Sequence, residues 1–203
     1  MQLKNTLTRY GAVAQLFHWV IVVLIITQFV LGLRADGLPQ FSIARLQLLA
    51  LHKSFGITVL GLAILRLIWR LFNPVPPMPP RTPRWQELAA QISHFLLYAL
   101  IFITPLLGWL MSSAYAVSVS WFKLFTLPNL IGPNKSAFEV LRESHHVVAY
   151  TLAVIALVHA AAGIKHHFVD RDDVLRRMLP LPESPTTAFV PTPNTTDTDS
   201  PTP

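Results

Sequence analysis

Residues 144–168 read SHHVVAYTLAVIALVHAAAGIKHHF. Most of this stretch is apolar, and it is long enough to cross a bilayer core, which takes about 20 residues of helix. His145 and His159 are 14 residues apart in it. At about 100° and 1.5 Å per residue, the two side chains lie within about 40° of one helix face and about 21 Å apart along the axis. We therefore expect a membrane helix with one histidine near each membrane surface.

Three further apolar stretches lie upstream, so the predicted spans are residues 12–33, 46–72, 88–111 and 145–164. The chain is 52% hydrophobic and 13% charged, whereas an average soluble domain has about 25% charged residues. Both features are typical of a membrane protein. The sequence predicts an all-α, integral membrane, up-and-down four-helix bundle as one domain over residues 1–180.

The segments between the spans also have distinct compositions. Residues 73–85 are rich in proline, which cannot continue a helix, and we expect a stiff extended connector. Residues 112–142 carry several aromatic side chains and are expected to lie at the membrane surface or to cap the bundle. Residues 181–203 are rich in Pro and Thr, so we predict a disordered tail.

The distribution of Lys and Arg predicts the orientation, because cytoplasmic loops carry an excess of these residues. One side of the predicted bundle has ten: Lys4, Arg9, Arg66, Arg70, Arg81, Arg84, Lys165, Arg171, Arg176 and Arg177. The other side has six: Arg34, Arg45, Lys53, Lys123, Lys135 and Arg142. Both termini are therefore predicted to lie in the cytoplasm. The basic residues flank the spans and form no continuous stripe, so no nucleic-acid partner is expected.

The chain contains no cysteine. This excludes disulfides, thiolate-ligated iron–sulfur clusters and covalent CxxCH attachment of haem. Any redox metal in this protein must be held by histidine.

Five histidines, namely His18, His52, His94, His145 and His159, lie in or at the ends of predicted spans, where ionisable residues are rare and usually functional. In an up-and-down bundle, His18 lies at the depth of His159, and His52 lies at the depth of His145. A six-coordinate haem iron takes one axial ligand from each side. We predict two haems b, an inner one between His18 and His159 and an outer one between His52 and His145.

Three other residues are candidates near the inner haem. Arg66 lies 14 residues after His52 and hence on the same helix face. It could bind a haem propionate, or it could anchor the helix end to lipid headgroups. His94 has no second histidine on its span and no partner left at its depth, and it is a candidate to bind a propionate or a quinone. His166 lies beyond the inner haem and could do the same, or it could be a solvated loop residue.

Some neighbouring positions lead to weaker expectations. His146 is turned about 140° away from the face of His159, so we expect a surface or interface residue. Gly56 and Gly11 fall on the histidine-bearing stripes, where a missing side chain could make room for a flat macrocycle.

At this point the sequence resembles the bacterial cytochrome b561 family of small di-haem membrane proteins. The matching stretches are LFHW (16–19), LHKSFG (51–56), LRLIWR (65–70), SHFLLYALIFITPLLGW (93–109), the stretch 144–168 quoted above, and DRDDVLRRMLP (170–180). The resemblance implies that His18, His52, His145 and His159 are the axial ligands. It also implies a bacterial inner membrane protein that oxidises superoxide at the periplasmic face and reduces ubiquinone.

The leading functional prediction is therefore transmembrane electron transfer, because bis-histidine iron has no open position for oxygen activation. The six outer-side basic residues named above could form a basic funnel that steers superoxide. An alternative is a haem-b subunit that links quinone to a partner dehydrogenase, hydrogenase or periplasmic carrier. A second alternative is a haem-free transporter or proton pathway. The expected partners are membrane lipid, quinone, and either superoxide or a redox protein.

Overall fold

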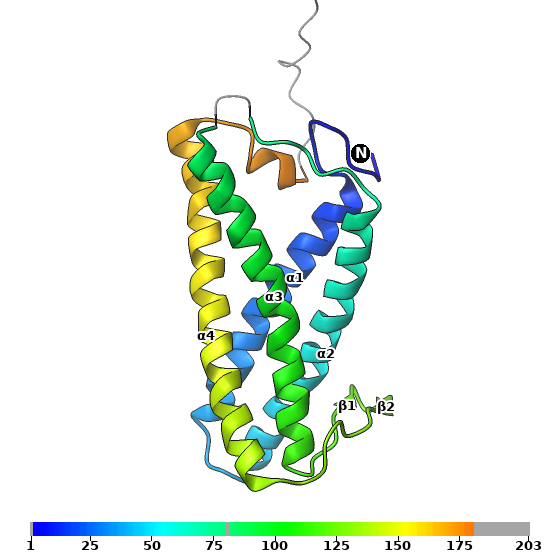
Figure 1. Cartoon of the computed structure of the whole chain (residues 1–203). Helices are drawn as coiled ribbons and strands as arrows, with labels where there is room; N and C mark the ends of the chain where they lie inside the picture. Colours follow the sequence, from blue (N-terminus) through cyan, green and yellow to red (C-terminus); the bar gives the residue numbers. More distant parts are fainter. Residues whose placement is uncertain (1, 80–81, 181–203) are drawn as a thin grey trace, which may run out of the picture.

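The computed structural model describes residues 2–79 and 82–180 (Figure 1); the predicted disordered tail lies outside these residues. Four long helices dominate the fold: α1 (Ala12–Asp36), α2 (Ile43–Leu71), α3 (Arg84–Ala114) and α4 (Lys135–Lys165). A π-helical turn (His166–Asp170) and a 3-10 turn (Arg176–Met178) follow α4. Each of the four helices is long and apolar enough to cross a membrane.

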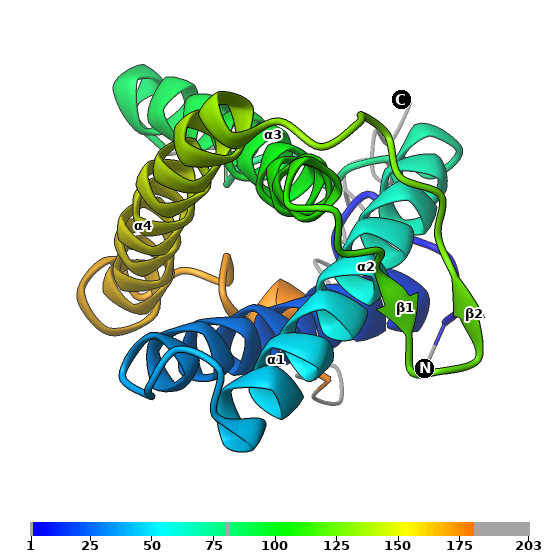
Figure 2. The same cartoon turned by 90° about the horizontal axis from the view of Figure 1, so that it is seen from below.

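The helices run up and down and are arranged as a ring (Figure 2). Helix α1 packs on α2, α3 packs on α4, and α2 and α3 join the two pairs. The predicted all-α four-helix bundle is confirmed. The segments that precede α1, connect α2 to α3 and follow α4 lie at one end, which we call the terminal end (Figure 1). The other end carries a small β-hairpin, and we call it the hairpin end.

Short polar caps fix two of the helix starts. The side chain of Ser42 accepts a hydrogen bond from the backbone N–H of Arg45 before α2, and Asn134 accepts one from Ala137 before α4. Helix α4 thus starts at Lys135, ten residues before the start of the predicted membrane span at His145. The first turns of α4 are too charged to count as membrane span, but their residues still favour helix. The other predicted ends lie within four residues of the observed ones.

Most large apolar side chains of the helices point outward. Leu16, Val23, Ile26 and Leu157 are each at least 60% exposed, which suits a surface that contacts lipid tails. Among the described residues, the fully buried apolar side chains of the helices are few: Ile21, Ala35, Val59, Ala63, Ala114 and Leu152. The middle of the ring is therefore not filled by apolar side chains alone.

Hydrogen bonds join the three segments at the terminal end. Side chains from the N-terminal segment and α1 donate to backbone carbonyls of the connector and of the C-terminal segment: Asn5 to Pro74, Arg9 to Leu179, Gln15 to Arg177 and Trp19 to Met178. Arg177 in turn donates to the Pro77 carbonyl at 2.6 Å. These bonds close one end of the bundle.

The hairpin end is fastened to α2 by one buried serine. Strands β1 (Ser120–Trp121) and β2 (Phe125–Thr126) pair antiparallel. The hydroxyl of Ser54 donates to the Ser120 carbonyl and accepts from the N–H of Phe122, both at 3.0 Å. The indole N–H of Trp121 donates to the hydroxyl of Thr58 at 3.0 Å. The aromatic segment thus covers α2 close to His52, as expected of a cap.

Candidate functional site

The structure brings the rings of His52 of α2 and His145 of α4 close together at the hairpin end. Their ring centroids are 6.1 Å apart and their planes are inclined at 77°. Two imidazoles that bind one metal ion from opposite sides, each with a nitrogen at about 2 Å, have centroids roughly 6 Å apart. The separation therefore fits one iron between the two rings.

Hydrogen bonds fix which nitrogen of each ring faces the metal position. Nδ1 of His52 lies 3.2 Å from the backbone oxygen of Gln28, and Nδ1 of His145 lies 3.0 Å from that of Thr104. A carbonyl oxygen can only accept, so each Nδ1 must carry the proton and donate it. Nε2 of each ring is then the free ligand atom, as is usual for metal-binding histidine.

A cavity of about 970 Å³ opens between the helices at the same end. This lies at the upper limit for pockets that bind cofactors and other small molecules, about 300–1,000 Å³. Helices α1 to α4 all contribute to its wall, which includes His52, His145, Phe29, Ile101 and Tyr150. An apolar wall with two opposed imidazoles fits the flat, mostly apolar macrocycle of haem b.

Three histidines meet at the terminal end. The centroids of His18 and His159 are 6.4 Å apart, with planes inclined at 74°. His94 of α3 also approaches His159, at 5.2 Å, although His159 is the residue predicted to pair with His18. A distance of 5.2 Å is short for two rings on opposite sides of one iron, whereas 6.4 Å suits them. The geometry thus favours His18 over His94 as the partner of His159.

Arg66 lies at the terminal end as predicted, beside a second arginine. The guanidinium carbons of Arg66 and Arg70 are 5.6 and 5.7 Å from the ring centroid of Tyr98, close enough for cation–π attraction. Burial raises the pKa of the neighbouring Tyr10 phenol, and the positive charges of Arg70 and Arg66 partly oppose this rise. The two arginines therefore place positive charge where an anionic propionate would be stabilised, although the role of Arg66 stays a prediction.

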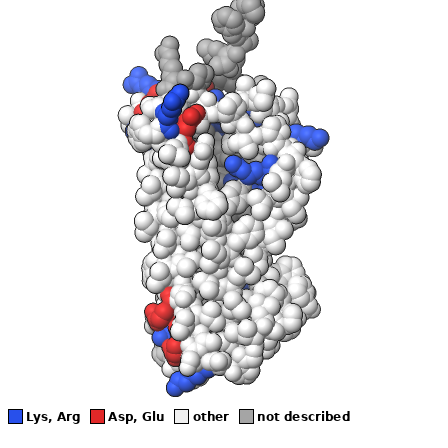
Figure 3. All heavy atoms as spheres, viewed as in Figure 1, with Lys and Arg blue, Asp and Glu red and all other residues white. Residues whose placement is uncertain are grey.

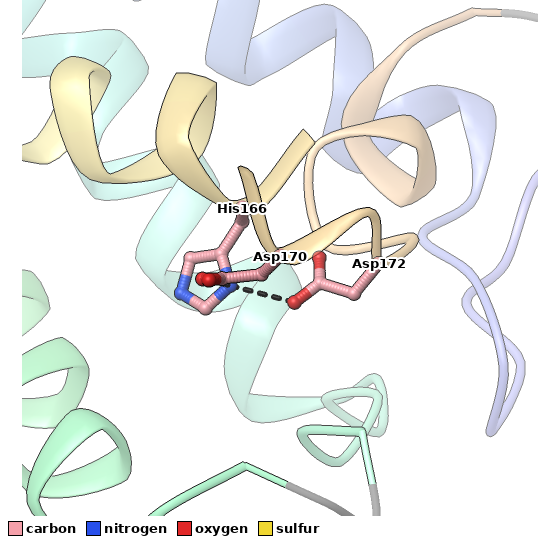
Figure 4. Close-up of side chains that lie close together, drawn as sticks. All are labelled: His166, Asp170 and Asp172. Carbon is pink, nitrogen blue, oxygen red and sulfur yellow. Dashed lines mark hydrogen bonds and ion pairs between the residues drawn. The ribbon is translucent and has the colours of Figure 1, made fainter. Parts of the chain in front are cut away.

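His166 is held by carboxylates at the end of α4 (Figure 4). Its Nδ1 lies 2.6 Å from Asp172 and 3.3 Å from Asp170, while Lys165 binds Asp170 at 2.6 Å. The His166 side chain is 13% exposed, so the alternative of a solvated loop residue is wrong. One histidine and two carboxylates whose ligand atoms lie within 4.8 Å are a possible metal-binding set. Lys165 already balances part of their charge.

Charges of both signs surround the cavity mouth at the hairpin end. Of the six residues predicted to form a basic funnel, four line the cavity: Arg45, Lys53, Lys135 and Arg142. Arg45 lies 3.7 Å from Asp36, and Arg142 lies 3.1 Å from both Glu139 and Glu143. Figure 3 shows acidic and basic side chains together at this end. The predicted basic funnel is therefore only partly basic, because carboxylates lie beside two of its arginines.

His146 agrees with the expectation of a surface residue. Its side chain is 42% exposed, and its Nε2 lies 4.0 Å from a carboxylate oxygen of Asp36. It also lines the cavity, but it is the ring of His145 that lies 6.1 Å from the ring of His52. Helix phase thus separates His145 from His146, although the two are adjacent in sequence.

Of the two glycines considered in the sequence analysis, Gly56 lines the cavity, and both glycines also leave room for other parts of the chain. A Cβ at Gly56 would lie 2.9 Å from the side-chain nitrogen of Gln28, which itself donates to the backbone oxygen of His52. A Cβ at Gly11 would collide with the backbone of Leu3 and Lys4. Gly56 therefore makes room for a polar contact between α1 and α2, and Gly11 for the N-terminal segment.

Sequence reasoning missed the backbone carbonyls of Gln28 and Thr104, which orient the hairpin-end histidines. It also missed Gly32 and Gly108, against which those two rings lie. Every residue has a carbonyl, so no sequence signal could single out these two. In the sequence, Gly32 and Gly108 are simply small residues within apolar spans. Glycine is common there in ordinary helix contacts, so nothing marked these two positions as special.

Comparison with known proteins agrees with this geometry. A family model described as prokaryotic cytochrome b561 matches residues 9–181. Cytochrome b561 homolog 2 of Escherichia coli K12 is 33% identical over 88% of this chain and 95% of its own length. Homolog 1 of the same organism is 30% identical over 86% and 98%. A probable superoxide oxidase, CybB, of Yersinia pestis is 26% identical over 85% and 96%. The chain therefore belongs to the prokaryotic cytochrome b561 family of multi-pass membrane proteins, which bind haem b and transfer electrons across the membrane.

Proposed function

We propose that the chain binds two haems b and passes electrons from superoxide at the hairpin end to ubiquinone at the terminal end. His52 and His145 would hold one haem, and His18 and His159 the other. The observation that carries this proposal is the pair of facing imidazoles at each end, with centroids 6.1 and 6.4 Å apart. We further propose a bacterial inner membrane location with both termini in the cytoplasm, which makes the hairpin end periplasmic.

Helix α4 supplies one ligand at each end, so it sets the distance between the two sites at about 21 Å along its axis. Bound haem supplies an iron that changes between the ferric and ferrous states one electron at a time. The overall reaction would be balanced as follows: two superoxide ions and one ubiquinone, with two protons, give two molecules of oxygen and one ubiquinol. The protein must therefore supply protons at the quinone end but not at the superoxide end.

Superoxide as the donor is supported by the name of the Yersinia pestis relative and by two lysines. Lys53 and Lys135 line the cavity mouth, and neither forms an ion pair with any residue in the described ranges. With the two arginines offset by three carboxylates, these lysines carry the positive charge that could attract an anion. No covalent contact with superoxide is needed, since an electron can pass through the haem edge.

Ubiquinone at the terminal end is supported by polar groups that could bind or protonate its oxygens. His94 lies 5.2 Å from His159, and His166 donates to or shares a proton with Asp172 at 2.6 Å. A histidine–carboxylate pair near the membrane surface can carry protons from water toward a reduced quinone. We propose His94 and His166 for quinone or propionate contacts and Arg66 for a propionate.

The test is a visible spectrum and a haem-to-protein ratio of the purified protein, first air-oxidised, then dithionite-reduced, then with superoxide added anaerobically. We expect about two b haems per chain, reduction by superoxide, and reoxidation by ubiquinone. If two haems are reduced by dithionite but not by superoxide, the alternative of a subunit that links quinone to a partner dehydrogenase, hydrogenase or periplasmic carrier is favoured. Absence of haem would refute the assignment of the histidines.

A further inference from the structure

The two hairpin-end histidines rest on glycines in a repeated arrangement. The ring of His52 lies against Gly32 of α1, where a Cβ would be 3.5 Å from Cε1. The ring of His145 lies against Gly108 of α3, where a Cβ would be 3.2 Å from Cε1 and 3.4 Å from Nδ1. The carbonyls that accept from the two rings belong to the residues one turn earlier, Gln28 and Thr104.

This repetition has a simple geometric cause. A carbonyl inside a helix already accepts from the N–H four residues later, but it has a second lone pair. The residue four positions later is the glycine in both cases, and its missing side chain exposes that carbonyl to a ring from the neighbouring helix. The glycines therefore allow each Nδ1–H to donate to a helical carbonyl.

The terminal-end pair differs. Nδ1 of His18 is buried and has no hydrogen-bond partner among the described residues. In addition, Arg66 and Arg70 place two positive charges near this end. The two predicted haem sites are therefore unequal in their hydrogen bonds.

We propose that Gly32 and Gly108 are positioning residues that hold the hairpin-end histidines in their hydrogen bonds and thereby give the hairpin-end haem the lower midpoint potential. This inference rests on the proposed binding of two haems. Donation from Nδ1 makes an imidazole a more basic ligand, which stabilises ferric iron and lowers its potential. Electrons then move downhill from the hairpin end to the terminal end.

The test is an optical redox titration of the purified holoprotein and of its Gly108→Ala and Gly32→Ala variants. A Cβ 3.2 Å from the His145 ring must displace it by a few tenths of an ångström, which weakens its hydrogen bond to Thr104. We expect Gly108→Ala to raise the lower of the two midpoint potentials by up to about 59 mV, equal to a tenfold change in the one-electron equilibrium. The higher potential should stay unchanged. Gly32→Ala should leave both potentials nearly unchanged, because its Cβ would lie in ordinary van der Waals contact with the His52 ring at 3.5 Å.

The matched control is Gly61→Ala, which makes the same change in α2 where a Cβ would meet nothing within 4 Å. It should leave both potentials unchanged. The proposal is overturned if the wild-type protein shows two equal potentials, if Gly108→Ala moves only the higher one, or if Gly61→Ala has the same effect. If Gly108→Ala does not bind haem, Gly32→Val is titrated instead, because a side chain larger than that of alanine must displace the His52 ring; an unchanged lower potential there overturns the proposal.

A failure of the proposed function would give a different experimental result from a failure of this inference. It appears as a wild-type haem-to-protein ratio other than about two, and in that case the inference fails with it. Failure of this inference alone leaves the ratio intact and shows only in the potentials.

Discussion

Replacing His145 by leucine should remove one haem and leave the other. The His52 ring would then face an apolar side chain, and a gap of 6.1 Å between ring centroids leaves the iron with a single nitrogen ligand. His146 also lines the cavity, but its side chain is 42% exposed and its Nε2 lies 4.0 Å from Asp36, so we do not expect it to replace His145. The terminal-end site is about 21 Å away along α4 and keeps both ligands. The haem-to-protein ratio should therefore fall from about two to about one.

The assay is haem content by the pyridine haemochrome method against protein concentration, together with the reduced-minus-oxidised spectrum. His146→Leu is the matched control, since it makes the same change at the adjacent position and should keep both haems. If His145→Leu keeps both haems, or if His146→Leu loses one, the assignment by helix phase is refuted.

The same assay distinguishes His18 from His94 at the terminal end. Their ring centroids lie 6.4 and 5.2 Å from that of His159, and only the longer separation suits two rings on one iron. His18→Leu should lose a haem, whereas His94→Leu should keep both. The opposite pattern would show that His94 is the ligand.

Three further predictions concern the rest of the chain. Ser54→Ala should lower the free energy of unfolding by about 1–3 kcal/mol, because it leaves the N–H of Phe122 without its acceptor; unchanged stability in detergent would contradict this. Because burial raises the pKa of Tyr10 above 10.0, the unfolded chain should lose this proton first as pH rises past that value. Stability should then fall above pH 10, and the fall should be shallower in Tyr10→Phe, as checked by thermal melts at alkaline pH. Lys53→Gln should slow reduction by superoxide at low salt and have little effect in high salt, where charges are screened; an equal effect at both salt concentrations would argue against steering.

Some of the histidine arrangement could be predicted from spacing alone. An α-helix turns by a fixed angle per residue, so the 14-residue interval between His145 and His159 places both on one face whatever surrounds them. Up-and-down topology then matches their depths with His52 and His18. Spacing could not show that His94 also approaches His159, because that depends on how α3 is rotated about its own axis.

The charges at the cavity mouth, in contrast, could not be predicted from the sequence. Counting Lys and Arg by side predicted a basic funnel, but Asp36, Glu139 and Glu143 are brought to the same place by three-dimensional packing. Asp36 is far from α4 in sequence, and both glutamates lie outside the predicted membrane span that starts at His145.

The sequence by itself determined the membrane class, the four spans and the depth of each histidine, since these follow from apolar length and helix periodicity, which are local properties. Only the tertiary structure decided which ring faces which, which carbonyls accept from Nδ1, and where glycine lets a ring approach a neighbouring helix. Those features depend on the rotation and separation of packed helices. They arise from contacts between residues far apart in the chain, such as Gly108 and His145, and no local pattern encodes them.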